Sequence, residues 1–463
     1  MKKYISIFLV SLFAITAFAQ TDDDLFGGSD DDFFADDGIE VVENVTAKSE
    51  LSKGSLFEAG SIKIGGRIDA SIATSTVLSA DDDKDFGEHL KDTSLNPTLS
   101  SFLSVDARPT EILRLYTKFG FGYPYVDKAT AYLNATSSDL DDIAKKIPVL
   151  AADGSFALVT PVTLSVSNYF KVKEVFTDFS VADRAFFRFG LHTVTWGTGY
   201  FFSPVSDIIN ASSINPEDVD AQVDGVLNLR TQVTFPDSQN CLWAYVIPSS
   251  SLKAIDTAFA AKYDLVLGGW EIGFGGYYKY QNSPKVVLTA SGSLKKCTIF
   301  GELVYRYGAD SEWLENTDWD DKKNIIQATA GVSYMFKEPQ IMIAGQYYYD
   351  GNDKDMKHEY FTYGHNLAAM VNFGKILGNT DLTATLFGMV NFGKEDLPDM
   401  YKAMLDQLGM GSFVNTATFS GTINYTPFKN FAIGFGPYIT LYAWDEKPVV
   451  AAKLTATLGG GKF

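Results

Sequence analysis

The feature that most limits the fold is a repeated alternation of apolar and polar residues. In residues 113–123, "LRLYTKFGFGY", leucine and aromatic side chains occupy most odd positions, whereas Arg114, Tyr116 and Lys118 occupy even ones. Residues 184–194 and 225–235 repeat the pattern. Because successive side chains of a β-strand point to opposite faces, each segment has one apolar and one polar face. The pattern predicts a β-sheet with one face in an apolar medium.

The spacing of these segments predicts that the sheet closes into a barrel. We expect eighteen strands, at residues 61–75, 98–108, 111–123, 170–181, 184–195, 222–235, 239–248, 255–267, 269–280, 284–292, 295–307, 322–337, 338–350, 361–376, 378–393, 411–427, 429–443 and 449–460. Every second connection is short, such as "RPTE" and "LGG", and the others are mostly long and acidic. This order is typical of an antiparallel up-and-down transmembrane β-barrel with short periplasmic turns and long extracellular loops. Sixteen strands is the alternative count, and an even count lets the first strand pair with the last.

A soluble β-sandwich or propeller is the alternative fold. It would also alternate, but its outward face should carry charges. Here one parity is nearly free of charge in strand after strand, which favours a membrane barrel. Aromatic residues near the strand ends, among them Tyr123, Trp270 and Trp444, suit the two girdles of such a barrel. The sequence therefore predicts an all-β transmembrane barrel over residues 56–463.

The N-terminal residues predict export. Two lysines precede an apolar run that ends at Ala19, the pattern of a secretory signal peptide over residues 1–19. The run is shorter than the roughly 20 apolar residues of a membrane-spanning helix. Residues 20–55 are acidic and are predicted to form a disordered periplasmic tail, with a plug in the barrel as the alternative. An exported barrel of this kind is expected in the outer membrane.

Composition and motifs exclude several other functions. The formal charge of −19 and the pI near 4.6 argue against nucleic acid as a partner, which would call for a basic face. Cys241 and Cys297 belong to no CxxC or Cys/His cluster, so neither a disulfide scaffold nor a thiolate zinc site is expected. No GxSxG or HExxH motif occurs, and "GGGKF" and "WGTGYFF" lack the rest of a nucleotide-binding loop. We expect no catalytic residue, no metal and no cofactor.

Ionisable side chains on the polar parity predict the lining of a water-filled pore. The candidates are Arg67, Arg114, Lys118, Glu174, Asp178, Arg184, Arg188, Arg230, Glu302 and Arg306. Charges of both signs suit an aqueous lumen, but pairs that only bridge the wall would give the same pattern. The sequence alone leaves open whether the arginines form a net positive stripe along the lumen. Such a stripe would favour the passage of anions.

The stretch "WGTGYFFSPVSDIIN", residues 196–210, predicts a constriction or mouth loop. Its candidate residues are Trp196, Gly197, Gly199, Tyr200, Phe201, Phe202, Pro204 and Asp207. We expect Trp196 at the membrane interface, the glycines at a sharp turn, and the three aromatic rings packed within the loop. Plain loop packing is the alternative. Residues 124–169 are a second candidate for an inward-folded loop, and residues 395–409 have the spacing of a short amphipathic helix.

Together with the C-terminal Phe463, these features resemble porin-like outer-membrane β-barrel proteins of diderm bacteria. The acidic, aromatic N-terminal segment is similar to those of some spirochaete membrane proteins. The resemblance covers the chain from about residue 56 and implies a channel for passive diffusion of small hydrophilic solutes, surrounded by outer-membrane lipid. It also implies that the barrel-assembly machinery recognises Phe463, although Leu454 and Leu458 lie on the opposite parity, so that a bulge is needed. No oligomeric state follows.

Two other functions stay open. One is a plugged barrel that transports hydrophobic, fatty-acid-like substrates, and the other is a closed surface adhesin or structural barrel. The first predicts an apolar outer pocket and an inserted N-terminal segment, and the second predicts a filled lumen.

Overall fold

The fold is described from a computed structural model of the chain. The described residues are 62–77, 87, 91, 93–123, 126–134, 147–150, 156–167, 170–182, 184–209, 225–236, 238–249, 253–351, 361–395, 416–428, 431–442 and 448–459. The predicted signal peptide over residues 1–19, the predicted tail over residues 20–55 and the predicted helix at 395–409, apart from residue 395 at the end of a strand, therefore lie outside the described residues.

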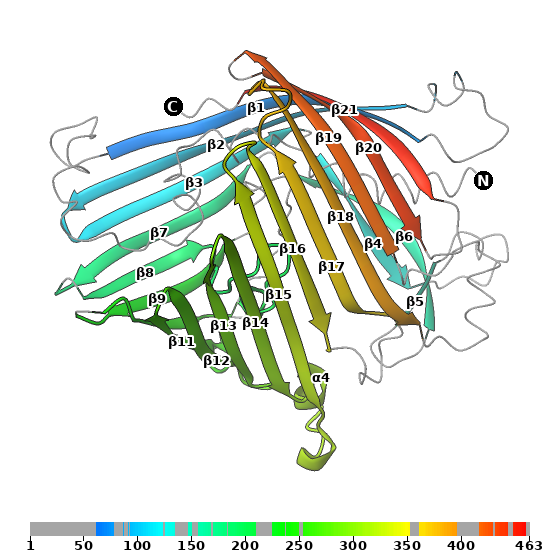
Figure 1. Ribbon diagram of the computed structural model, residues 1–463. Helices are drawn as coiled ribbons and strands as arrows, with labels where there is room; N and C mark the ends of the chain where they lie inside the picture. The colour runs from blue at the N-terminus through cyan, green and yellow to red at the C-terminus, as the bar shows by residue number, and fades with distance from the viewer. Residues whose placement is uncertain are drawn as a thin grey trace.

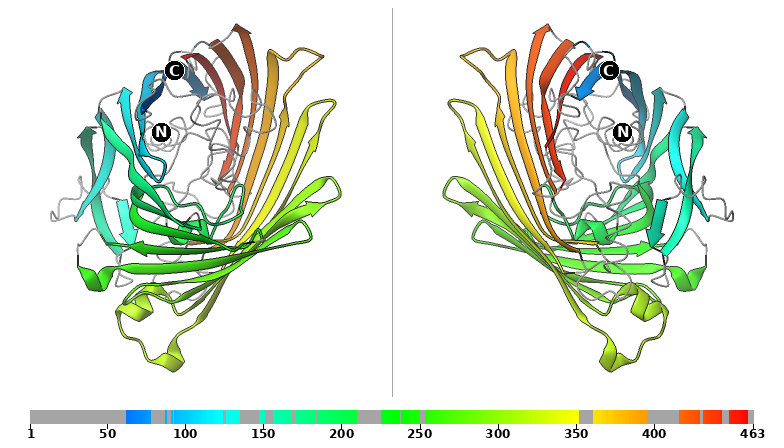
Figure 2. Two further views of the ribbon diagram at one scale, coloured as in Figure 1. Left: turned by 90° about the vertical axis from the view of Figure 1, so that its left-hand side faces the viewer. Right: turned by 90° about the vertical axis from the view of Figure 1, so that its right-hand side faces the viewer.

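Eighteen strands form one closed antiparallel sheet. They are β1 (Ile62–Val77), β2 (Ser94–Thr110), β3 (Leu113–Tyr123), β7 (Lys171–Val181), β8 (Ala185–His192), β9 (Val226–Thr234), β10 (Cys241–Ile247), β11 (Ala258–Leu267), β12 (Trp270–Tyr278), β13 (Lys285–Leu294), β14 (Cys297–Tyr307), β15 (Asn324–Phe336), β16 (Ile341–Asp350), β17 (Phe361–Phe373), β18 (Leu382–Glu395), β19 (Thr416–Phe428), β20 (Phe431–Tyr442) and β21 (Val449–Gly459). Each pairs with its neighbours along the chain, and β1 also pairs with β21, which closes the ring. Figures 1 and 2 show the tilted strands around a central space. The predicted barrel and its count of eighteen strands are confirmed.

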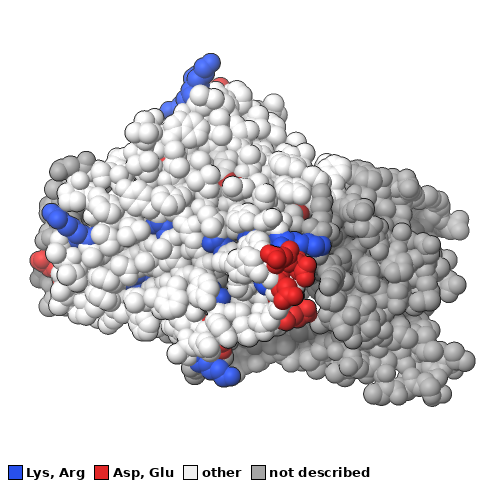
Figure 3. Space-filling view, turned by 90° about the horizontal axis from the view of Figure 1, so that it is seen from below, with Lys and Arg blue, Asp and Glu red and all other residues white. Residues whose placement is uncertain are grey.

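The two faces of the wall differ as the alternation predicts. On β13, Val286 and Leu288 are 57% and 44% exposed, whereas Val287 and Thr289 between and beside them are 1% and 2% exposed. The exposed set points away from the lumen and is apolar, so the outer face suits lipid rather than water. Figure 3 shows one side of the molecule, where a broad surface is largely free of charge and acidic side chains gather toward one edge. The barrel is therefore a membrane barrel, and the soluble sandwich or propeller is excluded.

The connections also follow the predicted order. The turn between β11 and β12 has only two residues, Gly268 and Gly269, with φ of +61° and +83°. Two successive positive φ values are the requirement of the tightest hairpin turns, which glycine meets without steric cost. At the opposite end of the barrel, longer connections carry α4 (Asp310–Leu314) and the short 3-10 helices η3 (Ser206–Ile208), η4 (Ala254–Asp256) and η5 (Trp319–Asp321). Within the described part of the chain, no helix has both the length and the apolar character needed to cross a bilayer.

One part of the long connection between β3 and β7 was not predicted. Residues 124–169 were expected to be an irregular loop, but they contain β4 (Val126–Asn134), β5 (Ile147–Leu150) and β6 (Phe156–Ser167). These strands form a separate antiparallel sheet in the order β4-β6-β5. The prediction of an irregular loop was wrong here, because strands in this segment pair with each other rather than with the barrel wall.

Candidate functional site

The chain that follows β8 turns into the barrel and lies against the inner face of more distant strands. Figure 2 shows this segment inside the ring of strands. We call residues 193–209 the inner loop. Its contacts reach β10, β14, β16 and β18, so one short segment covers the inner wall over half of the barrel.

Trp196 is buried against the wall, with 3% of its surface exposed. Its indole nitrogen donates a hydrogen bond to the carbonyl oxygen of Val205, 2.5 Å away, and its ring meets that of Tyr245 edge to face. Lys262 donates a hydrogen bond of 2.7 Å to the carbonyl oxygen of Trp196. The expectation of Trp196 at the membrane interface was wrong, because β8 ends at His192 and the chain has already turned inward at residue 196.

Glu302, in the middle of β14, binds the inner loop by four hydrogen bonds. Its Oε1 accepts from the backbone nitrogens of Thr198 and Gly199, at 2.5 and 2.6 Å, and from the hydroxyl of Ser203, at 2.9 Å. Its Oε2 accepts from the backbone nitrogen of Val205 at 2.9 Å. Only 4% of Glu302 is exposed, so the carboxylate is solvated by the loop rather than by water.

Gln346, on β16, holds the next part of the loop. Its Oε1 accepts hydrogen bonds from the backbone nitrogens of Tyr200, Phe201 and Phe202, at 3.1, 2.6 and 3.2 Å. Its amide nitrogen donates to the carbonyl oxygen of Phe202 and to the hydroxyl of Thr329, both at 2.6 Å. The loop therefore satisfies its backbone groups on two polar side chains of the wall, as a buried segment must.

The two predicted loop glycines are needed for close approach. A Cβ atom at Gly197 would lie 2.2 Å from Ser203 Oγ and 2.4 Å from Glu302 Oε1. A Cβ atom at Gly199 would lie 1.9 Å from the carbonyl oxygen of Phe202. No larger residue fits at either position without displacing the loop. The glycines therefore allow the loop backbone to lie in direct contact with the wall side chains that bind it.

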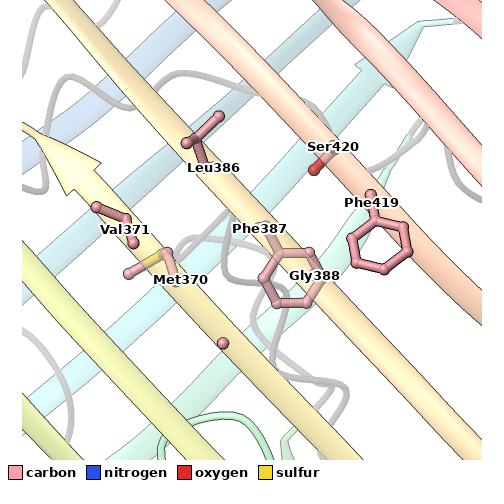
Figure 4. A pocket seen from close by; sticks show the side chains of 8 residues that line it. Met370, Val371, Leu386, Phe387, Gly388, Phe419 and Ser420 are labelled. Atoms are coloured by element: carbon pink, nitrogen blue, oxygen red, sulfur yellow. The ribbon is translucent and has the colours of Figure 1, made fainter.

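Aromatic rings complete the contact. Phe201 is buried and packs against Phe387 of β18 at 5.8 Å between ring centroids, and Phe202 stacks on Tyr348 of β16 at 5.4 Å. On the outer, lipid-facing side of the same wall, an apolar hollow of about 300 Å³ lies between β17, β18 and β19, where the ring of Phe419 reaches over Gly388 (Figure 4). Its lining is almost entirely carbon, and it offers little to a hydrophilic solute.

The wall on β2, β3, β7, β8 and β9 is charged. Asp178 receives hydrogen bonds from Nε and Nη2 of Arg188, at 2.7 and 3.0 Å. Arg114 lies between two carboxylates, 3.0 Å from Asp106 and 3.4 Å from Asp178. The ring of Phe176 lies 3.9 Å from the guanidinium of Arg188, between the charges. These half-buried groups form one network on the inner face of adjacent strands.

Cations outnumber carboxylates on these five strands. Strand parity, pairing and the contact of Lys173 with Gly120 place seven described cations on the inner face, Arg108, Arg114, Lys118, Lys171, Lys173, Arg188 and Arg230, against three described carboxylates, Asp106, Glu174 and Asp178. Lys118 lies over the ring of Phe102, at 4.5 Å, and Arg230 lies 5.5 Å from the ring of Trp243. The arginines that pair with Asp106 and Asp178 are partly neutralised, and among the described side chains of these strands the positive charges are in surplus.

The remaining predicted residues divide by place. Arg306 is buried and donates to Gln327 at 2.7 Å, so it bridges the wall. Arg184 is exposed in the turn between β7 and β8. Pro204 is buried in the inner loop and Asp207 is exposed at its far end. The side chain of Arg67 lies outside the described part of the chain.

At the loop end of the barrel, a polar cluster ties β13 to α4. Asp310 accepts hydrogen bonds of 2.9 Å from both the backbone nitrogen and the hydroxyl of Ser283, and it lies 3.4 Å from Nζ of Lys285. Burial alone would raise the pKa of the Asp310 carboxyl. Lys285 and the two bonds from Ser283 outweigh it and hold that pKa below its ordinary value.

Among the described residues, no group of three or more His, Cys, Asp and Glu side chains is placed to hold a metal ion. Cys241 and Cys297, which lie on β10 and β14, form no disulfide with each other.

Closure, an apolar outer face and a loop folded onto the inner wall define an integral β-barrel protein of the outer membrane. No protein-family model matches the chain, and no curated protein matches it. Among solved structures it is similar to OccK9 (OpdG) of Pseudomonas aeruginosa, with a TM-score of 0.49 and 9% identity over 86% of this chain and 98% of that chain. OpdL of the same organism gives 0.49 and 8%, over 87% and 99% of the two chains. OccAB4 of Acinetobacter baumannii gives 0.46 and 9%, over 87% and 98%. Identity this low transfers no substrate to this chain.

Proposed function

We propose that the protein is an outer-membrane channel for passive diffusion of small hydrophilic solutes, with the inner loop as its constriction. The observation that supports this most is the position of the inner loop against one part of the barrel wall. Glu302 and Gln346 hold it against the wall from β10 to β18, and the charged wall from β2 to β9 lies on the other part of the ring. Solutes would then pass between the loop and the charged wall.

The charged wall also supports a preference among solutes. Fixed charges along a narrow path attract ions of the opposite sign and exclude those of the same sign. Because inward cations outnumber carboxylates on β2, β3, β7, β8 and β9, we propose that small anions pass more readily than cations. The preference is modest, since Asp106 and Asp178 pair with three of the arginines.

Single-channel recording of the refolded full-length protein in a planar lipid bilayer tests the proposal. We expect an ohmic conductance that survives deletion of residues 20–50, and a reversal potential in a salt gradient that reports anion preference. A silent protein would overturn the proposal and favour a closed adhesin or structural barrel. Conductance that begins only after the deletion would favour a plugged transporter.

A further inference from the structure

The inner loop surrounds one wall carboxylate with hydrogen-bond donors. We infer that residues 198–205 form an anion-binding nest whose built-in ligand is the carboxylate of Glu302, and that this ligand holds the loop in position. Removal of the side chain would then leave a site that a small free carboxylate, such as acetate, can fill.

The arrangement is that of a ligand site. Three backbone N–H groups, from Thr198, Gly199 and Val205, and the hydroxyl of Ser203 converge on the two oxygens at 2.5 to 2.9 Å. Both oxygens are engaged, and the group is 4% exposed. Successive backbone N–H groups that converge on one point are a common way for proteins to bind a free anion. In this protein the anion is supplied by the wall.

Apolar packing alone does not account for this geometry. The rings of Trp196 and Phe201 would hold the loop to the wall without any carboxylate, but the N–H groups of residues 198, 199 and 205 would then be buried without an acceptor. Such groups destabilise a buried segment unless they are paired. Gln346 satisfies the N–H groups of a different part, residues 200–202, so the two wall residues act on separate segments.

The inference predicts two effects, one on conductance and one on hydrogen exchange, and they rest on different assumptions. A change in conductance rests on the proposed function, because it requires the inner loop to be the constriction. Protection of the loop amides from hydrogen exchange requires only that Glu302 holds the loop. Measurement of both therefore separates failure of this inference from failure of the channel proposal.

Hydrogen exchange followed by mass spectrometry, on the full-length protein refolded in lipid, is the decisive experiment. With Glu302→Ala, we expect peptides that cover residues 198–205 to exchange at least about tenfold faster, since each lost bond to a charged group corresponds to about that factor. Sodium acetate should restore protection, and sodium chloride at equal ionic strength should not. In the bilayer, the variant should conduct differently from the wild type, and acetate should reverse the difference.

Three further proteins complete the test. Glu271→Ala on β12 is the matched control, because within the described chain Glu271 makes no hydrogen bond to the inner loop, and it should leave loop exchange unchanged. Gln346→Ala should speed exchange at residues 200–202 and leave the N–H groups of residues 198, 199 and 205 protected. If Glu302→Ala does not fold, Glu302→Gln replaces it; its amide NH₂ cannot accept a hydrogen bond, so protection should fall either at residues 198–199 or at residue 205. Unchanged protection in the folded Glu302 variant, or equal rescue by chloride, would overturn the inference. If the wild type is silent in the bilayer, the channel proposal fails. The exchange result still decides whether Glu302 holds the inner loop in position.

Discussion

Replacement of Gly199 by alanine tests whether the position of the inner loop against the wall sets the width of the channel. The added Cβ atom would lie 1.9 Å from the carbonyl oxygen of Phe202, whereas real Cβ atoms essentially never come within 3.0 Å of another heavy atom. The backbone must therefore move by about 1 Å, the difference between these distances. Phe202 cannot yield easily, because its carbonyl oxygen accepts a bond from Gln346 and its ring stacks on Tyr348.

The movement separates the loop from its acceptor on the wall. The bond from Gly199 N to Glu302 is 2.6 Å long. A shift of about 1 Å takes it beyond the range of a hydrogen bond. Loss of a bond to a charged group costs about 1.5–3 kcal/mol, and overpacking adds about 1–3 kcal/mol. The docked loop should thus be destabilised by roughly 3–5 kcal/mol, which shifts its equilibrium at least about a hundredfold toward the undocked state.

The assay is single-channel conductance, with urea unfolding as the measure of barrel stability. We expect Gly199→Ala to raise the conductance and its noise while the urea midpoint of the barrel stays close to that of the wild type, because no ladder hydrogen bond changes. Gly345→Ala is the control, since its Cβ atom would meet nothing closer than 3.9 Å. A Gly199→Ala channel with the conductance of the wild type would refute the reasoning.

Four further predictions follow from the same structure. The double variant Arg188→Gln, Arg230→Gln should shift the reversal potential in a salt gradient toward cations, and an unchanged potential would contradict their place in the lumen. Trp196→Phe loses the 2.5 Å bond to a loop carbonyl, and faster hydrogen exchange across the inner loop should show a cost of about 1 kcal/mol. Because the pKa of Asp310 is held below its ordinary 3.8, its contribution to stability is present above that pH and is lost as the pH falls further, so the difference in thermal midpoint between wild type and Asp310→Asn should vanish in acid. A difference that is independent of pH would exclude the charged carboxylate as its source. Deletion of Phe463 should lower the yield of assembled barrel in cells and leave the conductance of refolded protein unchanged; an unaltered yield would remove Phe463 as an assembly signal.

The barrel wall could be predicted from the sequence because strands and short turns are each specified by residues that are close together in the chain. A strand needs only its own residues to show two faces, and a hairpin needs only a short turn such as the one at Gly268 and Gly269. Eighteen strands follow from eighteen such segments, and closure follows because lipid leaves no other partner for the edges of the first and last strands. The sheet of β4, β5 and β6 was missed because nothing local distinguishes strands that leave the wall from an irregular loop.

The contacts of the inner loop could not be predicted in the same way. Thr198 meets Glu302, 104 residues further along the chain, and Tyr200 meets Gln346, 146 residues away. The curvature and stagger of the closed sheet bring these positions together, and no spacing in the sequence encodes them. Parity predicted correctly that Glu302 points inward. A side chain on the inner face of a barrel, however, can contact either water or a chain segment that is folded into the lumen. Gln346 was not singled out at all.

A second signal in the sequence does separate the two kinds of inner wall. The inward residues of β14 include Phe300 and Val304 on either side of Glu302, and both are buried. Strands that are apolar on both parities are covered on both faces, as in sheets packed between two layers. On β3 the inward residues include Arg114 and Lys118, which suit a face toward water. An inward carboxylate between two apolar inward neighbours is therefore better interpreted as an anchor for covering chain than as a residue that lines the pore. Applied to β16, where Met342 and Ala344 precede Gln346, the same argument finds the second anchor.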